Sequence, residues 1–556
     1  MLGNGETEDT DDNGKNKNDS EDEETEEIEK SDDDCDQESN SGSDEHVFDE
    51  QKARRAVAKF FCSEAFPPRM VNDVFFRRIL NVANPQFHIG IDTVERDCLE
   101  IYEEERAKIK QILRNLDGRI SLSVDILRHE RRCGYDYHYL CVKAHFIDDT
   151  WKLKNWILNY FRIWYPNEMA TDEAIQKSLS DWGIESKIST ITMGNDDLHD
   201  DITEIVKDHI HGKNELQLNA CLFRVYCCAD ILSQMVKDAY EEIDDAIFKI
   251  RQIVYWGKSL PLWVITLEML QEALTLESKG EFYSSDEYED YDIPSPDEWN
   301  RVRGVCKLVE SIYNVAHMLF DMKHSTAPMY LHNLGELQAS LTRESVSCDS
   351  FVSTLAQKML EKLDKYWKDM FLVLSIATVM DPRCKMKFIE FSLSRCEGSD
   401  HDSEVTIVLE AIRRLYNDYV TPISEREYCV SDASSSDSDE EGHQDSEDVT
   451  IKWLQEYDQF IQSNHKPPKS ELDLYLEEDV FPWSQDFNAL SWWRVNSHKY
   501  PHLSKMARDF LAIPISLATS FEAYYTTQRQ AEERVISLGR DITNALMCTQ
   551  SWFRRH

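Results

Sequence analysis

The sequence is poor in the features that mark several common classes of protein. Its 14 cysteines are spread too sparsely over 556 residues for a disulfide scaffold, which fits a reducing compartment. No apolar run reaches the roughly 18 residues that a membrane helix requires, and the N-terminus is acidic where a signal peptide is basic and then apolar. We therefore expect a soluble intracellular protein with no membrane partner.

Basic residues are also scarce. The chain has 61 Lys and Arg against 105 Asp and Glu, which gives a formal net charge of -44. Because DNA binding sets Lys and Arg against phosphates, this balance excludes a protein that coats nucleic acid over its whole surface. Any DNA contact is expected to be local.

The chain does contain enough apolar side chains for large cores. Hydrophobic residues make up 41% of it, and its length predicts two to four domains. Residues 1–46 hold 20 acidic residues against 3 Lys, so this segment buries too little apolar surface to offset its ordering entropy. We expect residues 1–46 to form a disordered acidic tail and residues 429–449 to form a second acidic segment, a linker.

Between these acidic segments the hydrophobic pattern changes from helical to strand-like and back. Residues 47–117 have helical apolar spacing, and then Ile120, Leu122 and Val124 alternate with polar residues as in a strand. Further strands are expected at 137–146, 151–161 and 187–193, with a helix at 172–180. Three antiparallel strands, a helix and a fourth strand are the opening of an RNase H-like fold. The pattern is then helical to about residue 419, so we predict an α/β fold in which a large all-helical insertion interrupts an RNase H-like core.

Several segments resemble one family over long collinear stretches. They are Gly118–Asp125, Val142–Asp149, Lys362–Lys368, Val379–Arg383, Leu472–Leu476, Leu490–Arg494, Tyr500–Asp509 and Cys548–Trp552. Together they resemble plant hAT-type DNA transposases of the DAYSLEEPER and RICESLEEPER kind, over residues 48–428 and 450–553. The resemblance implies a helical N-terminal region (47–117), the first part of the core (118–257), a helical insertion (258–428), and a hAT dimerisation domain with the end of the core (450–556).

The same resemblance implies three carboxylates that hold two divalent metal ions for DNA cleavage. Asp125 matches the first carboxylate, at the end of an alternating strand. Gly194 stands where the second is expected, and Phe521 stands where the third is expected. We therefore predict a catalytically inactive chain. The alternative is a residual nuclease in which neighbouring acids, Asp196 or Asp197 and Glu522, restore the site.

Other family signatures are altered as well. The family's Cys-x-x-His appears as Cys227-Cys-Ala-Asp230, and its Arg-Trp-Asn-Ser appears as Leu262-Trp-Val-Ile265. The resemblance implies that Trp263 could stack on DNA, whereas its spacing is that of a helical core residue. The family's zinc finger of the BED type needs two Cys and two His at short spacing, and the sequence shows no such set. We expect no structural zinc and no other cofactor.

Candidate DNA contacts lie close behind the strand that bears Asp125. Arg128, Arg131 and Arg132 form a basic group that would flank the groove where members of the family hold DNA. Contacts from this group to phosphates would not depend on DNA sequence. The alternative is an ordinary solvated face, which is what most such clusters are.

A crowded apolar segment near the C-terminus is the candidate dimer interface. Its members are Trp492, Trp493, Tyr500, Leu503, Met506, Phe510 and Leu511. The matching segment forms part of a subunit interface in the family, so the resemblance implies a homodimer through residues 470–553. Leu503, Met506 and Phe510 share one helix face, and burial within the monomer core is the alternative.

These observations lead to a nuclear protein without enzymatic activity, small-molecule substrate or cofactor. It would form a homodimer, bind DNA or chromatin weakly and act in transcriptional regulation. A second interpretation is an acidic protein-interaction factor whose charge repels nucleic acid and recruits basic partners.

Overall fold

The computed structural model describes residues 48–129, 137–163, 168–213, 216–254, 262–284, 291–320, 327–394, 401–420, 469–484, 487–519, 522–524, 529, 531 and 533–554. The predicted disordered tail (1–46) and acidic linker (429–449) lie outside the described residues. Contacts divide the chain into residues 1–49 and residues 50–556, and the second unit is described below. The predicted domain borders within it stay a prediction.

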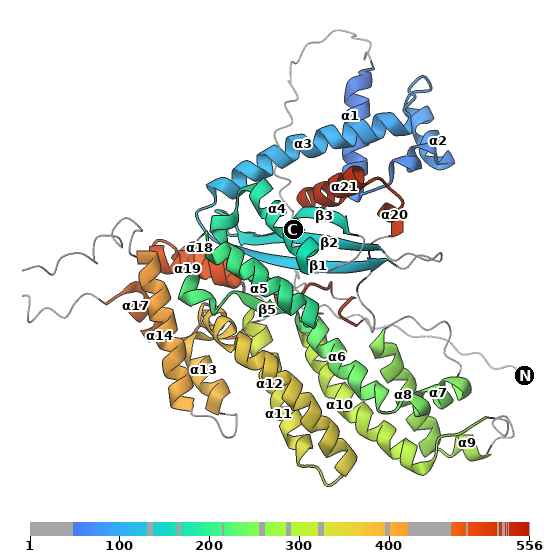
Figure 1. Ribbon diagram of the computed structural model, residues 1–556, viewed down its shortest axis with the longest axis vertical. Helices are drawn as coiled ribbons and strands as arrows, with labels where there is room; N and C mark the ends of the chain where they lie inside the picture. Colours follow the sequence, from blue (N-terminus) through green and yellow to red (C-terminus); the bar gives the residue numbers. More distant parts are fainter. Residues whose placement is uncertain are drawn as a thin grey trace, which may run out of the picture. The chain divides into compact units, whose positions relative to one another are not determined.

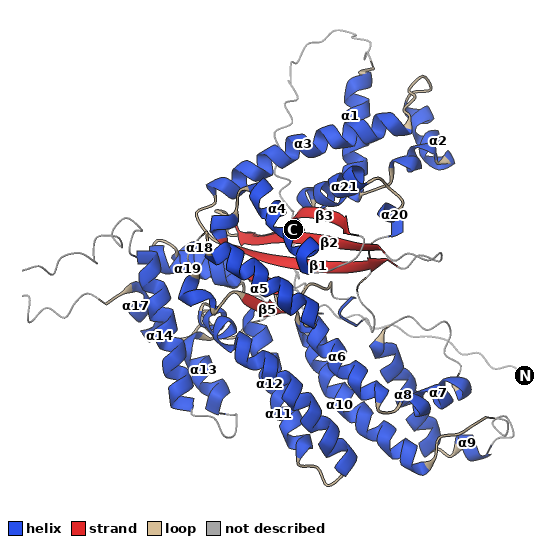
Figure 2. Ribbon diagram, in the orientation of Figure 1, coloured by secondary structure: helices blue, strands red, loops and turns tan. Residues whose placement is uncertain are grey.

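A five-stranded mixed sheet forms the centre of the α/β part (Figures 1 and 2). Its strands are β1 (Ile120–His129), β2 (Tyr137–Ile147), β3 (Leu153–Ile163), β4 (Ile188–Met193) and β5 (Arg224–Tyr226). The order is β3-β2-β1-β4-β5, with β1, β2 and β3 antiparallel and with β4 and β5 parallel to β1. This arrangement confirms the predicted RNase H-like core and all four of the predicted strands. The family resemblance alone implied a fifth strand ahead of Cys227, and β5 ends one residue before it.

Helices from both ends of the chain lie on the sheet or pack against the helices that cover it. They are α1 (Glu50–Glu64), α2 (Val74–Ala83), α3 (Ile91–Asn115), α4 (Glu168–Trp182), α5 (Asp197–His211), α20 (Glu533–Ile536) and α21 (Arg540–Phe553). Helix α21 packs against β3, α1 and α3, which Figure 1 shows as red and blue ribbons side by side. The sheet core therefore includes Tyr102 and Leu113 of α3 together with Ala545 and Trp552 of α21.

Along the outer edge of strand β3, which faces away from β2, side chains of α21 supply backbone hydrogen-bond partners. The amide of Tyr160 donates to Asn544 Oδ1 (2.8 Å), and the amide of Ile157 donates to Ser551 Oγ (2.9 Å). The indole of Trp552 donates to the carbonyl of Ile157 (2.9 Å). An open strand edge would leave such groups to water or to another chain, and the polar side chains of α21 satisfy them instead.

Most of the remaining described residues are helical, as predicted for the insertion. After β5 come α6 (Cys228–Glu241), α7 (Asp244–Ile253), α8 (Trp263–Ser278), α9 (Glu281–Ser284), α10 (Pro296–Phe320), α11 (Ala327–Ser345), α12 (Ser350–Val379), α13 (Lys385–Ser394) and α14 (His401–Val420). The C-terminal region adds α17 (Glu471–Glu477), α18 (Ala489–Asn496) and α19 (Pro501–Leu511). One apolar core joins both sets. None of the helices that the structure describes has the length and apolar character to cross a bilayer.

A buried lysine connects the insertion to the C-terminal region. Lys385, which begins α13, is only 2% exposed, and its Nζ donates to the carbonyls of Tyr475 (2.6 Å), Glu478 (2.9 Å) and Asp479 (3.3 Å). These carbonyls lie at the C-terminal end of α17, where the helix dipole favours a cation. The ammonium also lies 4.5 Å from the ring centroid of Tyr475. One side chain therefore holds the end of α17 against α13.

Replacing this lysine tests how strongly the two parts are connected. Lys385→Met keeps the apolar stem but leaves three buried carbonyls without their charged donor, so we expect a loss of about 2–3 kcal/mol in the free energy of unfolding. Urea denaturation measures the loss. Lys387→Met, at an exposed position two residues away, is the matched control and should change the free energy by less than about 0.5 kcal/mol. Equal stability of the two variants would contradict this account.

Candidate functional site

The first predicted carboxylate lies in a polar cavity at the end of the sheet. Asp125 is carried by β1 and is 6% exposed. The cavity has a volume of about 310 Å³. Its wall includes Asp125 of β1, Gly194 and Asp196 after β4, Asp230 and Lys237 of α6, and Glu522 and Arg529 of the C-terminal region. The parallel pairing of β1, β4 and β5 brings these segments to one place, as expected for the site of an RNase H-like fold.

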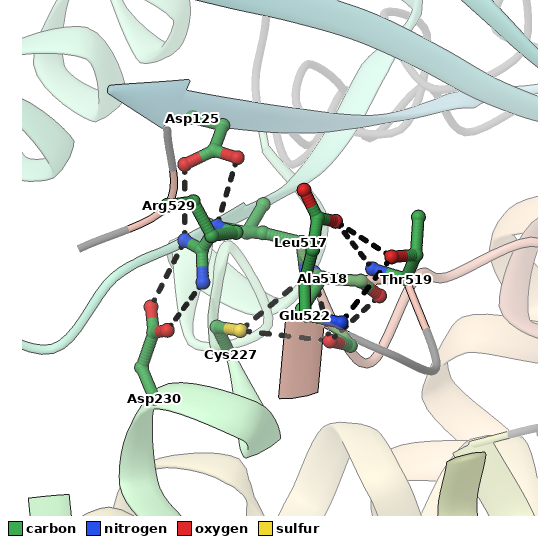
Figure 3. Close-up of polar contacts among 9 residues, drawn as sticks. Asp125, Cys227, Asp230, Leu517, Ala518, Thr519, Glu522 and Arg529 are labelled. Carbon is green, nitrogen blue, oxygen red and sulfur yellow. Dashed lines mark hydrogen bonds and ion pairs between the residues drawn. The ribbon is translucent and has the colours of Figure 1, made fainter. Parts of the chain in front are cut away.

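A guanidinium is bound to the first carboxylate. Arg529 donates to Asp125 twice, from Nε to Oδ2 and from Nη2 to Oδ1, both at 2.9 Å. The same guanidinium donates to Asp230, from Nη1 at 2.5 Å and from Nη2 at 3.2 Å (Figure 3). The side chains of Arg529 and Asp125 are 10% and 9% exposed. Both oxygens of Asp125 are therefore occupied by a cation that belongs to the chain.

The backbone fixes Arg529 in this position. The amide of Arg128 donates to the carbonyl of Arg529 (2.8 Å), and the amide of Ala531 donates to the carbonyl of Arg128 (3.0 Å). These two bonds hold the segment that bears Arg529 along the end of β1. Burial alone lowers the pKa of Arg529, but attraction from Asp125 and Asp230 outweighs it and raises the pKa well above its usual value. The guanidinium is charged at every pH at which the protein is folded.

Gly194 has no ligand to offer, and a histidine ring covers it. A Cβ atom at position 194 would lie 3.0 Å from two atoms of the His199 ring. Asp196, the N-cap residue of α5, fixes the position of that ring. Asp196 Oδ1 accepts a hydrogen bond from the His199 amide (3.0 Å) and lies 2.5 Å from His199 Nδ1. Asp197 begins α5 and is exposed. The two neighbouring acids therefore serve the start of the helix.

Glu522 also lines the cavity, but its carboxylate is engaged locally. Glu522 Oε2 accepts the amide of Thr519 (2.9 Å) and its hydroxyl (2.8 Å), and Thr519 Oγ1 accepts the amide of Glu522 (3.4 Å). This reciprocal pattern is a capping box for the short 3₁₀ turn Glu522–Tyr524 (Figure 3). Phe521, predicted to replace the third carboxylate, lies outside the described residues.

The donor set does not fit a pair of divalent metal ions. Such a site needs carboxylate oxygens that are free to face the metals. Here Asp125 faces Arg529, Asp196 faces His199, and Glu522 faces Thr519. Within the part of the chain that the structure describes, no three Asp, Glu, His or Cys side chains are grouped as metal ligands. In this conformation the carboxylates of the cavity are bonded to other groups of the protein.

Asp230, the last residue of the altered Cys-x-x-His motif, has a structural role in this chain. It stands where the family's motif has a histidine, on the first turn of α6, and it shares Arg529 with Asp125. Cys227, which the motif retains, is fully buried, and its Sγ accepts the amide of Leu517 (3.3 Å). Arg529 was not among the residues predicted from the sequence. No local pattern could have found it, because 404 residues separate it from Asp125.

Trp263 lies in the core. Its ring is fully buried and packs on Tyr524 (centroids 5.3 Å apart) and on Tyr313 (6.3 Å). Its indole nitrogen donates to the carbonyl of Ala523 (3.4 Å). The ring offers no exposed face on which a base could stack. We therefore correct the assignment of Trp263 to a DNA surface and describe it as a core residue that supports the cavity wall.

Several other basic residues form ion pairs within the fold. Arg54 bonds Asp97 (2.7 Å) and Arg55 bonds Glu104, both across the interface of α1 and α3. Arg383 bonds buried Asp381 (2.7 Å). In the predicted DNA-binding group only Arg128 is described, since Arg131 and Arg132 lie outside the described residues. Arg128 is three residues from Asp125 along β1, so strand alternation directs the two side chains to opposite faces.

The predicted dimer residues lie in the core of the single chain. Trp493, Tyr500, Leu503 and Met506 have no exposed area. Phe510 and Leu511 are 2% and 8% exposed, and Trp492 is half-buried against the same core. The Trp493 indole donates to the carbonyl of Met380 (2.7 Å), which ties α18 to the end of α12. The assignment of these buried side chains to an exposed interface is therefore corrected in favour of the monomer-core alternative.

Comparisons with known proteins cover most of the chain. Residues 133–222 match the ZBED1 RNase-like domain, residues 328–419 match the hAT-like transposase with RNase-H fold, and residues 471–553 match the hAT family C-terminal dimerisation region. The zinc finger BED domain-containing protein RICESLEEPER 2 of Oryza sativa subsp. japonica is 31% identical over 553 residues, which cover 91% of this chain and 75% of that protein. RICESLEEPER 4 of the same species is 30% identical (93% and 82% covered), and DAYSLEEPER of Arabidopsis thaliana is 30% identical (92% and 75% covered).

The pairing of Arg529 with two carboxylates can be tested by stability. Arg529→Met leaves Asp125 and Asp230 facing each other without a cation, so the free energy of unfolding at pH 7.5 should fall by about 3–5 kcal/mol. The deficit should shrink as the pH is lowered to 5, because protonation relieves the repulsion between the two unpaired carboxylates in the folded variant. Denaturant titration at both pH values gives the measurement.

A triple variant serves as the control for that measurement. Asp125→Asn and Asp230→Asn combined with Arg529→Met remove the unpaired charges, and this variant should regain most of the lost stability and lose the pH dependence. A single Arg529→Met variant that unfolds at the wild-type denaturant concentration would show that the pairing contributes nothing.

Proposed function

Because the chain belongs to the hAT transposase-like family that includes the RICESLEEPER and DAYSLEEPER proteins, we propose that it is a transposase derivative without strand-cleaving activity. It works as a nuclear homodimer that associates with DNA or chromatin in transcriptional regulation. The loss of cleavage is the part of this proposal that the geometry of the cavity supports best.

One observation carries the proposal. Arg529 supplies a positive charge next to Asp125, where the family's chemistry requires a metal ion. A metal ion would have to displace a two-pronged ion pair that is nearly shielded from water, and charge-assisted pairs of this kind are the strong ones. It would also have to leave a buried guanidinium without a partner, which is costly. Gly194 then supplies no second carboxylate to offset that cost.

The homodimer is supported by the match of residues 471–553 to the hAT family C-terminal dimerisation region. The described part of this region contains the helices α17, α18, α19, α20 and α21. Most of its large side chains belong to the core of one chain.

The DNA contact is proposed for the basic group Arg128, Arg131 and Arg132, which follows Asp125 in the sequence. Because the Arg128 side chain is directed to the opposite face of β1 from Asp125, this contact would lie outside the cavity. Its contacts would be made to phosphates and would not select a sequence. A second candidate function is supported by the ion pairs of Arg54, Arg55 and Arg383, which leave those cations with carboxylate partners. With a net charge of -44, the chain would then act as an acidic protein-interaction factor that recruits basic partners.

Loss of cleavage is tested with supercoiled plasmid. We expect no nicking or strand transfer in Mg²⁺ or Mn²⁺ above the level of an Asp125→Asn variant purified in the same way. That variant controls for contaminating nuclease. Metal-dependent nicking by the wild type that disappears in Asp125→Asn would refute the proposal.

The DNA contact is tested by the salt dependence of binding. Each phosphate contact contributes about -0.9 to the slope of log K against log salt concentration, so Arg128→Gln, Arg131→Gln and Arg132→Gln together should reduce the slope by roughly 2–3. Fluorescence anisotropy on a short duplex at 50–200 mM salt measures it. A charge-matched control carries Arg343→Gln, Lys387→Gln and Arg414→Gln, all at exposed positions. Equal slopes for the two triple variants, or no binding by the wild type at 50 mM salt, would favour the protein-interaction function.

A further inference from the structure

An exposed aromatic cluster lies within the region that matches the dimerisation model. Between α17 and α18, Trp483 is 60% exposed and Phe481 is 42% exposed. The rings of Phe481 and Phe487 are 4.7 Å apart, centroid to centroid. The guanidinium of Arg383 lies 4.5 Å from the centroid of Trp483 and 4.9 Å from that of Phe487. These four residues form one surface, which we call the Trp483 patch.

Hydrogen bonds to Asp381 and Pro382 fix two residues of the Trp483 patch in position. Arg383 bonds Asp381 through Nε (3.0 Å) and Nη2 (2.7 Å), and Asp381 is 2% exposed. The amide of Phe481 donates to the carbonyl of Pro382 (2.9 Å). A tryptophan fixed in this way loses little conformational entropy on binding, which is what distinguishes a binding anchor from a loosely exposed side chain.

We propose that the Trp483 patch is the face through which two copies of this chain associate. The proposal rests on the proposed homodimer and deepens it by naming the contact surface. Phe481, Trp483 and Phe487 all lie within residues 471–553, whose family model is a dimerisation region. Six of the seven residues that the sequence pointed to are buried by their own chain and cannot supply an exposed anchor, and Trp492 is half-buried against the same core.

Charge and symmetry favour a second copy as the occupant. Two chains of net charge -44 repel each other, so their contact must be apolar or neutral at its centre. The Trp483 patch fits this condition because its rings are uncharged and the Arg383 guanidinium that contacts Trp483 and Phe487 is paired with Asp381. A two-fold axis brings the same surface of both copies together, and an apolar, charge-balanced patch is complementary to itself. Trp and Arg are also the side chains that most often dominate interface energies.

Sedimentation velocity tests the surface directly. We expect a wild-type dimer at about 10 µM, and Trp483→Ser and Phe481→Ser should each raise the dimer dissociation constant roughly 30-fold or more. Both positions are exposed, so the melting temperature should stay within about 2 °C of the wild type. Phe248→Ser is the matched control, since Phe248 is 65% exposed on α7, outside the dimerisation region, and it should leave the dissociation constant unchanged.

The outcomes separate the surface from the dimer itself. A wild-type dimer that persists in both patch variants overturns the Trp483 patch and leaves the homodimer standing. A wild-type monomer at 10 µM overturns both. Hydrogen exchange needs no substitution and covers the case in which a variant loses its fold. On dilution from dimer to monomer, peptides that contain residues 478–490 should gain deuterium, and unchanged exchange there would also overturn the proposal.

Discussion

The return of the C-terminal segment to the edge of the sheet is the constraint on which the rest of the α/β part depends. The edge strand β3 would be open if α21 did not satisfy the backbone groups of Ile157 and Tyr160. The same return places α19 so that buried Asp509 accepts the Arg119 amide (2.8 Å) and the Tyr419 hydroxyl (2.5 Å), which joins the start of β1 to α14. It also delivers Arg529 to Asp125. The fold and the cavity thus share one long-range closure, whose entropic cost the apolar contacts of α21 offset.

This closure decides how much could be predicted from the sequence. The strands were predictable because Ile120, Leu122 and Val124 alternate locally, and the start of α5 was predictable because Asp196 and Asp197 are residues that favour a helix N-terminus. The position of Asp125 at the site followed from the strand and the family resemblance. Arg529 was not predictable, because its partner is 404 residues away and a single arginine carries no local signal.

The dimer residues show a different limit. The spacing of Leu503, Met506 and Phe510 establishes that one face of α19 is covered, but periodicity is the same whether the cover is the same chain or a second one. Only the three-dimensional packing shows that other residues of the same chain bury this face. The Trp483 patch, by contrast, has no periodic signal, because it lies in a connection between helices and acquires its shape from Arg383, about 100 residues earlier in the chain.

The histidine ring over Gly194 limits what single substitutions could do to the cavity. A side chain introduced at position 194 alone would require the His199 ring, whose nearest atoms lie 3.0 Å from the required Cβ, to move by a few tenths of an ångström. Removal of Arg529 alone would leave two nearby acids without a counter-charge. Neither single substitution therefore provides a set of carboxylates that are free to face metal ions. Opening the cavity to metal ions would need several coordinated substitutions, because each carboxylate in it is already bonded to a different partner.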